Sequence, residues 1–218
     1  MPGPEAVPGR ERGPLPGLVR LAEVMHAIRA GCPWDAEQTH ASLVRYLVEE
    51  TAEVVEAIEA GDDEQLREEL GDLLLQVYFH AEIAAEEDRF TLDDVASEIA
   101  AKLVARHPYV FTDAQVPDDV LGSWERRKRV EKARASALDG IPRPLDTLAR
   151  AAKVVSRARA HGVEVDLPSE QVGQDELGAA LLELVARAQA SGLDADQALR
   201  GALRRLETHI RAVEPPLP

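Results

Sequence analysis

The apolar residues of this chain recur with the period of an α-helix in nearly every segment, and this feature restricts the fold most strongly. One such stripe runs from Leu18 to Ile28, and a second runs from Val44 to Ile58. We find no convincing strand pattern, which would alternate with a period of two. Aromatic residues make up only 4%, whereas Ala, Leu, Glu and Arg, which favour helices, are abundant. The sequence therefore predicts an all-α fold built as a helical bundle.

The net charge of −15 narrows the range of partners. A surface that acidic repels DNA, RNA and anionic lipid, so we expect no nucleic acid and no membrane partner. No apolar run reaches the roughly 18 residues that a membrane-spanning helix needs. The single cysteine, Cys32, excludes an intrachain disulfide and fits a reducing compartment. We therefore expect a cytoplasmic protein, and a small phosphorylated ligand if a metal ion and local cations screen its charge.

The 218 residues suffice for one large domain or two small ones. Residues 1–17 are rich in Pro and Gly and are expected to form a disordered tail. The segment 139–145 is the clearest linker, and it separates a helical region over 18–138 from another over 146–218. Helices are expected over about 18–30, 42–60, 62–88, 91–106, 120–135 and 146–160, then two more after 174, with loops over 31–35 and 112–119.

Carboxylates gather on the second and third predicted helices. The second carries Glu49, Glu50 and Glu53, and the third carries Glu69 and Asp72. On each helix two acids lie three residues apart, so they share one face. The short turn between the helices favours antiparallel packing. If the helices pack through their apolar stripes, four of these acids converge at one end of the seam.

Four converging carboxylates raise one another's pKa and oppose folding unless a counter-charge is present. A divalent cation supplies that charge, and an all-oxygen site suits Mg²⁺, Mn²⁺ or Ca²⁺ rather than zinc. A solvated acidic face is the alternative, because the chain contains 40 Asp and Glu residues. Taken alone, the residues leave both interpretations open.

Four sequence blocks occur in a fixed order. One block contains the acids and consists of two runs. The first run is Leu47-Val-Glu-Glu-Thr-Ala-Glu53, which reads EExxE, and the second is Glu69-Leu-Gly-Asp-Leu-Leu-Leu75, which reads ExxD. The other blocks cover residues 31–39, 106–111 and 136–143. Together they resemble the MazG family of nucleotide pyrophosphohydrolases, strongly over about 18–160 and weakly elsewhere. The resemblance implies the all-α nucleotide pyrophosphohydrolase fold.

The resemblance also implies a role for each acid. In that family the acids bind Mg²⁺, so the ligands here would be Glu50, Glu53, Glu69 and Asp72, with Mn²⁺ as the second choice of metal. Glu49 would be an accessory acid. Either Glu49 or Glu53 would orient or deprotonate the attacking water.

Further residues are candidate nucleotide contacts, some of them through a match to the family motif. Lys102 and Arg106 share a helix face, and the motif implies that they reach the triphosphate; a pair of surface cations is the alternative. His107 would assist them or only shape the turn that follows. Trp34 lies in a Gly- and Pro-rich loop, where it would stack on the base or close the bundle end. Two looser matches, as nucleotide contacts or packing residues, are Trp124 and Lys128.

These features predict Mg²⁺-dependent hydrolysis of nucleoside triphosphates, ribo or deoxy, to the monophosphate and pyrophosphate, as part of nucleotide-pool house-cleaning. The residues do not indicate which phosphorus is attacked or which base is preferred. One alternative is a narrow pyrophosphatase for a single nucleotide such as dUTP. Another is a non-catalytic regulator that keeps only a metal-stabilised bundle, although the complete acid set argues against it.

The region 146–218 resembles a decayed, non-catalytic second copy of the same unit. The run that begins at Glu176 repeats the Glu69 block, with Ala179 where Asp72 would stand. No ExxE pair precedes it between residues 146 and 174. We therefore predict one catalytic site per chain. A chance similarity of Ala- and Leu-rich helices is the alternative.

The third predicted helix is apolar on nearly every side between Leu73 and Phe79, so it is expected to be central or to lie at a subunit interface. The family match implies a homodimer whose helices build the bundle together. The sequence therefore predicts a homodimer or a higher even oligomer.

Overall fold

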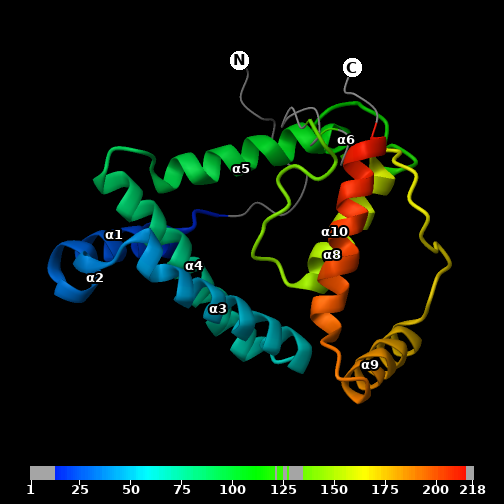
Figure 1. The fold of residues 1–218 in the computed structure, drawn as a ribbon. Coiled ribbons are helices and arrows are strands. Elements are labelled where there is room, and N and C mark those ends of the chain that lie inside the picture. The colour runs from blue at the N-terminus through cyan, green and yellow to red at the C-terminus, as the bar shows by residue number, and fades with distance from the viewer. Residues whose placement is uncertain (1–12, 121, 125–126, 128–134, 215–218) are drawn as a thin grey trace. The chain divides into compact units, whose positions relative to one another are not determined.

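The computed structural model describes residues 13–120, 122–124, 127 and 135–214, and within them the regular elements are all helices (Figure 1). The predicted all-α fold is therefore confirmed for the described part of the chain. The chain divides into two compact units, unit 1 over residues 1–114 and unit 2 over residues 115–218. None of the described helices is both long and apolar enough to cross a membrane.

The long helices lie within a few residues of their predicted positions. Unit 1 contains α1 (Pro16–Gly31), α2 (Pro33–Glu37), α3 (His40–Ala60), α4 (Asp63–Glu86), α5 (Leu92–Arg106) and α6 (Pro108–Phe111). Unit 2 contains α8 (Thr147–Ala160), α9 (Gln174–Ala190) and α10 (Ala195–Val213). The charged helix expected over 120–135 falls largely outside the described residues.

Capping residues set the boundaries of the two acid-bearing helices. Thr39 precedes α3 and forms a capping box with Ser42. Gly61 ends α3 in the left-handed conformation, with a φ of 68°, which glycine adopts without strain. Asp62 then accepts hydrogen bonds from two backbone N–H groups in the first turn of α4. Because only two residues separate α3 from α4, the helices form an antiparallel hairpin.

Two local predictions were wrong, each at a proline. Helix α1 begins at Pro16, inside the expected tail, because the first turn of a helix does not need the missing N–H. Pro33 begins α2 where a loop was expected. Pro108 begins the short helix α6 directly after α5, which ends at Arg106 as predicted. The remainder of the expected tail, residues 1–12, lies outside the described residues.

The hairpin buries a different face of α3 from the one predicted. Leu43 and Ala57 are buried, and Tyr46, Glu50 and Glu53 are partly buried on the same face. The expected stripe is exposed instead, each large apolar side chain by between 37% and 65%: Val44, Leu47, Val48, Val55 and Ile58. We call these five residues the α3 stripe. The prediction failed because helical period identifies an apolar face but not the partner that covers it.

The core of unit 1 gathers around the C-terminal half of α4. Its buried members come from three helices: Met25, Leu43, Tyr78, Phe79 and Ile83. The predicted central position of α4 is therefore confirmed for Tyr78 and Phe79, which are buried. Val77, the residue before them in the sequence, is 40% exposed.

Arg29 joins three helices of unit 1 through a side chain that is only 7% exposed. Its Nε donates to Oε1 of Glu86 at 2.8 Å, and its Nη2 donates to Oε2 of the same carboxylate. Its Nη1 donates to the backbone carbonyls of Asp35 and Gln38, at the end of α2. One buried cation therefore joins α1 to α4 through a bidentate ion pair and to α2 through hydrogen bonds.

Helix α4 ends in a left-handed turn without glycine. Asp88 has a φ of 53°, a conformation that Asp tolerates better than most residues. The N–H groups of Asp88 and Arg89 donate to the carbonyls of Ala85 and Ala84, the pattern of a Schellman motif. The turn brings the Arg89 side chain back to the first residue of α3.

Unit 2 has its own core between α8 and α10, where Val154 and Ile210 are fully buried. The segment 139–145, expected to be a linker, contributes Ile141 to this core. The buried Arg157 donates to two backbone carbonyls in and beside that segment. These bonds hold the Gly- and Pro-rich turn against α8. The domain boundaries drawn from the sequence stay predictions.

Helix α9 contacts α10 but buries none of its residues. Its exposed large apolar side chains are Leu177, Leu181, Leu182, Leu184 and Val185. The packing or assembly role expected for the C-terminal helices would cover such a surface, and it stays a prediction.

Candidate metal centre

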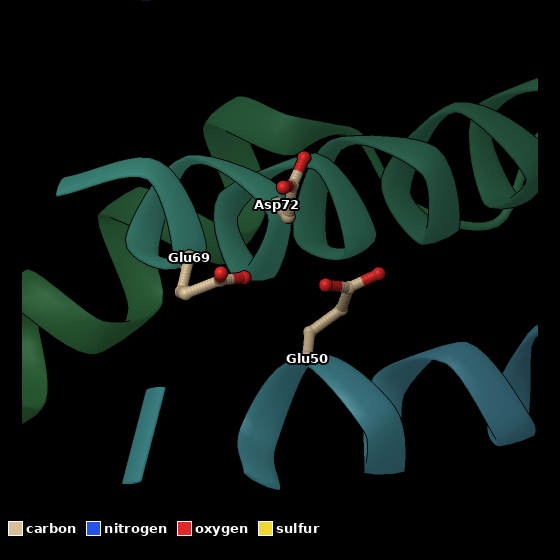
Figure 2. A group of neighbouring side chains, drawn as sticks. All are labelled: Glu50, Glu69 and Asp72. Carbon is tan, nitrogen blue, oxygen red and sulfur yellow. The ribbon is translucent and has the colours of Figure 1, made fainter. Parts of the chain in front are cut away.

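Three acids meet across the α3–α4 hairpin (Figure 2). Glu50 extends from α3, and Glu69 and Asp72 extend from α4. One carboxylate oxygen of each lies within 4.8 Å of those of the other two. All three side chains are partly buried. No other group of three His, Cys, Asp or Glu side chains in the described residues comes together in this way. We call these three residues the acid group.

The acid group is electrostatically strained without a cation. The pKa of Glu50 is raised, first by burial and then by the charges of Asp72 and Glu53. The pKa of Glu69 is raised as well, first by desolvation and then by Glu53 and Asp72. Each shift means that the folded chain disfavours the ionised carboxylate. The donors are carboxylate oxygens only, and such a set fits a hard divalent cation such as Mg²⁺ or Mn²⁺.

Glu53 borders the acid group without belonging to it. It lies three residues after Glu50 on the same partly buried face of α3. Its charge acts on both Glu50 and Glu69, which places it close to them. Glu49 is exposed, and its charge acts on Glu50. Three of the four predicted ligands therefore converge, and the ligand and catalytic roles stay predictions.

The predicted phosphate-binding cations lie on α5, which diverges from the hairpin in Figure 1. Lys102 Nζ lies 2.5 Å from Oε1 of Glu98, one turn earlier. Arg106 is buried at the C-terminal end of the helix. The Nδ1 atom of His107 lies 2.8 Å from the carbonyl oxygen of Leu103, so this ring helps to end α5. The C-terminal end of α5 therefore lies apart from the middle of the hairpin in its own chain.

An aromatic pair lies one helical turn from Glu50. The ring centroids of Trp34 and Tyr46 are 6.1 Å apart, and the rings meet edge to face at 75°. The Arg45 guanidinium lies 4.4 Å from the centroid of the Tyr46 ring. Trp34 remains half exposed. The sequence interpretation missed Tyr46, although its position four residues before Glu50 was an available signal.

The remaining predicted site residues lie in unit 2. Trp124 is partly buried there, and Lys128 lies outside the described residues. Glu176, the acid of the suspected second copy, is exposed on α9. The described part of unit 2 brings no three metal-ligating side chains together.

Residues 38–111 match the family model described as the MazG nucleotide pyrophosphohydrolase domain, and this span contains the acid group. An uncharacterized 26.1 kDa protein of Streptomyces cacaoi is 48% identical to this chain, covering 98% of the chain and 89% of that protein. The nucleoside triphosphate pyrophosphohydrolase of Escherichia coli (strain K12) is 39% identical, covering 89% of this chain and 86% of that protein. The chain belongs to the MazG nucleotide pyrophosphohydrolase family.

The relationship extends beyond the matched domain. The MazG nucleoside triphosphate pyrophosphohydrolase/pyrophosphatase of Thermotoga maritima is 34% identical over 216 residues, covering 89% of this chain and 84% of that protein. The MazG resemblance inferred from four sequence blocks is therefore confirmed.

Proposed function

We propose that this MazG family member hydrolyses nucleoside triphosphates to the monophosphate and pyrophosphate, with Mg²⁺ held by Glu50, Glu69 and Asp72. Family membership supports the reaction. The convergence of three carboxylates from two helices is the observation that carries the site. Their raised pKa values add support, because a cation would relieve the repulsion among them.

The metal ion, Glu53 and the aromatic pair have separate roles in the proposed reaction. A bound divalent ion supplies positive charge that offsets the charge developing on the phosphates. Glu53 borders the group, where it orients the attacking water and accepts its proton. The base stacks on the Trp34–Tyr46 pair, and such stacking contributes about 1–3 kcal/mol per base in single-stranded nucleic acid complexes.

Pyrophosphate release from dATP, measured with and without Mg²⁺, tests the proposal. We expect release with Mg²⁺ and none after chelation, whereas a non-catalytic regulator would release none in either case. A panel that includes dUTP separates a broad enzyme from a narrow one. Hydrolysis in ¹⁸O-labelled water identifies the attacked phosphorus. Label in the monophosphate indicates the α position, and label in pyrophosphate indicates the β position.

We further propose that the chain forms a homodimer through the α3 stripe. Five large apolar side chains on one exposed helix face form a patch that water disfavours by about 25 cal/mol per Å². The divergence of α5 adds support, because a second copy is a source of phosphate-binding cations that the same chain does not bring to its own acids.

Val48→Glu is expected to convert the dimer, or a higher even oligomer, into a 23.8 kDa monomer in sedimentation at micromolar concentration. Val48 is 65% exposed in the α3 stripe, so the charge disrupts an interface without entering the core. Val116→Glu is the matched control, because Val116 is 64% exposed in a loop. A wild-type chain that sediments as a monomer would contradict the assembly.

Glu176→Ala is expected to leave turnover unchanged. Glu176 is exposed on α9, and one acid cannot hold Mg²⁺, which needs several oxygens in near-octahedral array. Steady-state rates with dATP provide the measurement. A large decrease in turnover with the fold retained would mean that the second unit is catalytic.

A further inference from the structure

Two histidines lie next to each other at the end of the α3–α4 hairpin that is opposite the turn at Gly61. His40 is the first residue of α3, His80 lies on α4, and their Nδ1 atoms are 2.7 Å apart. The rings are nearly parallel, with centroids 5.0 Å apart and an interplanar angle of 6°. Nη2 of Arg89 lies 2.5 Å from Nε2 of His40. Neither the sequence interpretation nor the proposed reaction uses these three residues.

Arg89 determines where the ring protons lie, because a guanidinium only donates hydrogen bonds. Nε2 of His40 must therefore accept, which leaves the hydrogen of this neutral ring on Nδ1. That hydrogen is donated to Nδ1 of His80, so the proton of His80 lies on Nε2. The donor and acceptor geometry thus assigns one tautomer to each ring, and both rings are neutral.

We propose that Arg89, His40 and His80 form a hydrogen-bond relay in which both imidazoles are neutral, and that this relay clamps α3 against α4 and opens in mildly acidic solution. A proton added to His40 lies on Nε2 and faces an N–H of Arg89. A proton added to His80 lies on Nδ1 and faces the N–H of His40. Either proton places two hydrogen-bond donors opposite each other, so one hydrogen bond of the relay breaks.

The charged groups around the relay do not offset such a proton. Burial is the first cause that lowers the pKa of His80, and repulsion from a protonated His40 ring is the second. Arg89 is itself positive, and its Nε lies 2.6 Å from a carboxylate oxygen of Glu87. The acids on the adjoining elements have other partners: Glu82 with His26, Glu86 with Arg29, and Asp94 with Thr91.

The relay lies in the same antiparallel register as the acid group. His40 faces His80 at the open end of the hairpin, and Glu50 faces Asp72 nearer to the turn at Gly61. The relay and the turn therefore fix the two helices at both ends of the stretch that holds the acids. His40 and His80 are thus positioning residues, and the relay itself does not depend on the proposed reaction.

The direction of the pH effect follows from His80. Its pKa is lower in the folded chain than its ordinary value near 6.5, so the unfolded chain binds more protons between these two values. The relay contributes its full stabilisation above about pH 6.5, and this stabilisation is lost as the pH falls toward the pKa of His80 in the folded chain.

Two-bond ¹⁵N–¹H spectra of the full chain, labelled at histidine, test the tautomers directly. At pH 7.5 we expect the proton of His40 on Nδ1 and that of His80 on Nε2, with single His→Gln variants assigning the signals. A cationic ring at this pH, or a proton on Nδ1 of His80, would overturn the relay. This measurement does not depend on enzyme activity or on the stability of a variant.

Thermal unfolding between pH 7.5 and 5.5 tests the clamp. The wild-type midpoint is expected to fall by about 5 °C through the relay. The double variant His40→Gln/His80→Gln has no titrating ring at these positions, so its midpoint should fall by less than half as much. His209→Gln, at an exposed position on α10, is the matched control and should keep it. An unchanged decrease in the double variant would refute the proposal.

Discussion

Glu50→Gln is expected to reduce pyrophosphate release from dATP about 100-fold or more while the fold is retained. The variant keeps the size of the side chain but removes one of the three charges that converge on the proposed metal. In metal-free buffer its thermal midpoint should rise, because the raised pKa of Glu50 means that the ionised carboxylate destabilises the folded chain at neutral pH. Steady-state assays and circular dichroism provide the two measurements.

The control for this variant is Glu56→Gln, an exposed position on the same helix, which should retain the wild-type rate. Glu53→Gln should also lose most activity, since Glu53 borders the acid group. A wild-type rate for Glu50→Gln would remove the acid group from the mechanism. A wild-type rate for Glu53→Gln alone would remove only the water-activating role.

Arg29→Ala is expected to destabilise unit 1 by about 2–3 kcal/mol. The truncation removes the bidentate pair with Glu86 and the hydrogen bonds that Arg29 donates to two backbone carbonyls at the end of α2. Glu86 is 43% exposed and regains water, which keeps the loss below that of a fully buried pair. Urea unfolding followed by Trp34 fluorescence, in a Trp124→Phe background, reports on unit 1.

Arg20→Ala provides the comparison, because Arg20 is 73% exposed and its ion pair is with the exposed Glu23. Its effect should stay below about 0.5 kcal/mol. The pair with Arg29 also lowers the pKa of Glu86, so its stabilisation is present above the ordinary carboxyl pKa and is lost as the pH falls. This acid-dependent loss should disappear in Arg29→Ala. Equal stabilities of the two variants would contradict the role assigned to Arg29.

Local signals made much of the fold predictable from the sequence. The helix ends predicted at residues 60, 62 and 91 are confirmed, and there Gly61, Asp62 and Thr91 form bonds to residues at most a few positions away. The turn between α3 and α4 spans only two residues, so antiparallel packing of the acid pairs followed from spacing alone. The convergence of Glu50 with Glu69 and Asp72 was predictable for this reason.

The features that the sequence did not reveal depend on contacts between distant residues. Arg29 and Glu86 are 57 positions apart, and His40 and His80 are 40 apart. No local pattern pairs one histidine or arginine with a specific partner so far along the chain. The α3 stripe was predicted to pack inside the hairpin and is exposed, for a related reason. Amphipathicity does not distinguish a helix face that packs in the core from one that binds another protein chain.

The two-residue connection between α3 and α4 also has a kinetic consequence. Helices joined by so short a turn close small loops, and such contacts form faster than contacts between distant segments. Ribosomal synthesis proceeds from the N-terminus, so the whole hairpin emerges before α8, α9 and α10 have been made. We therefore expect the carboxylates to come together on the nascent chain, where a cation can stabilise the hairpin while synthesis continues.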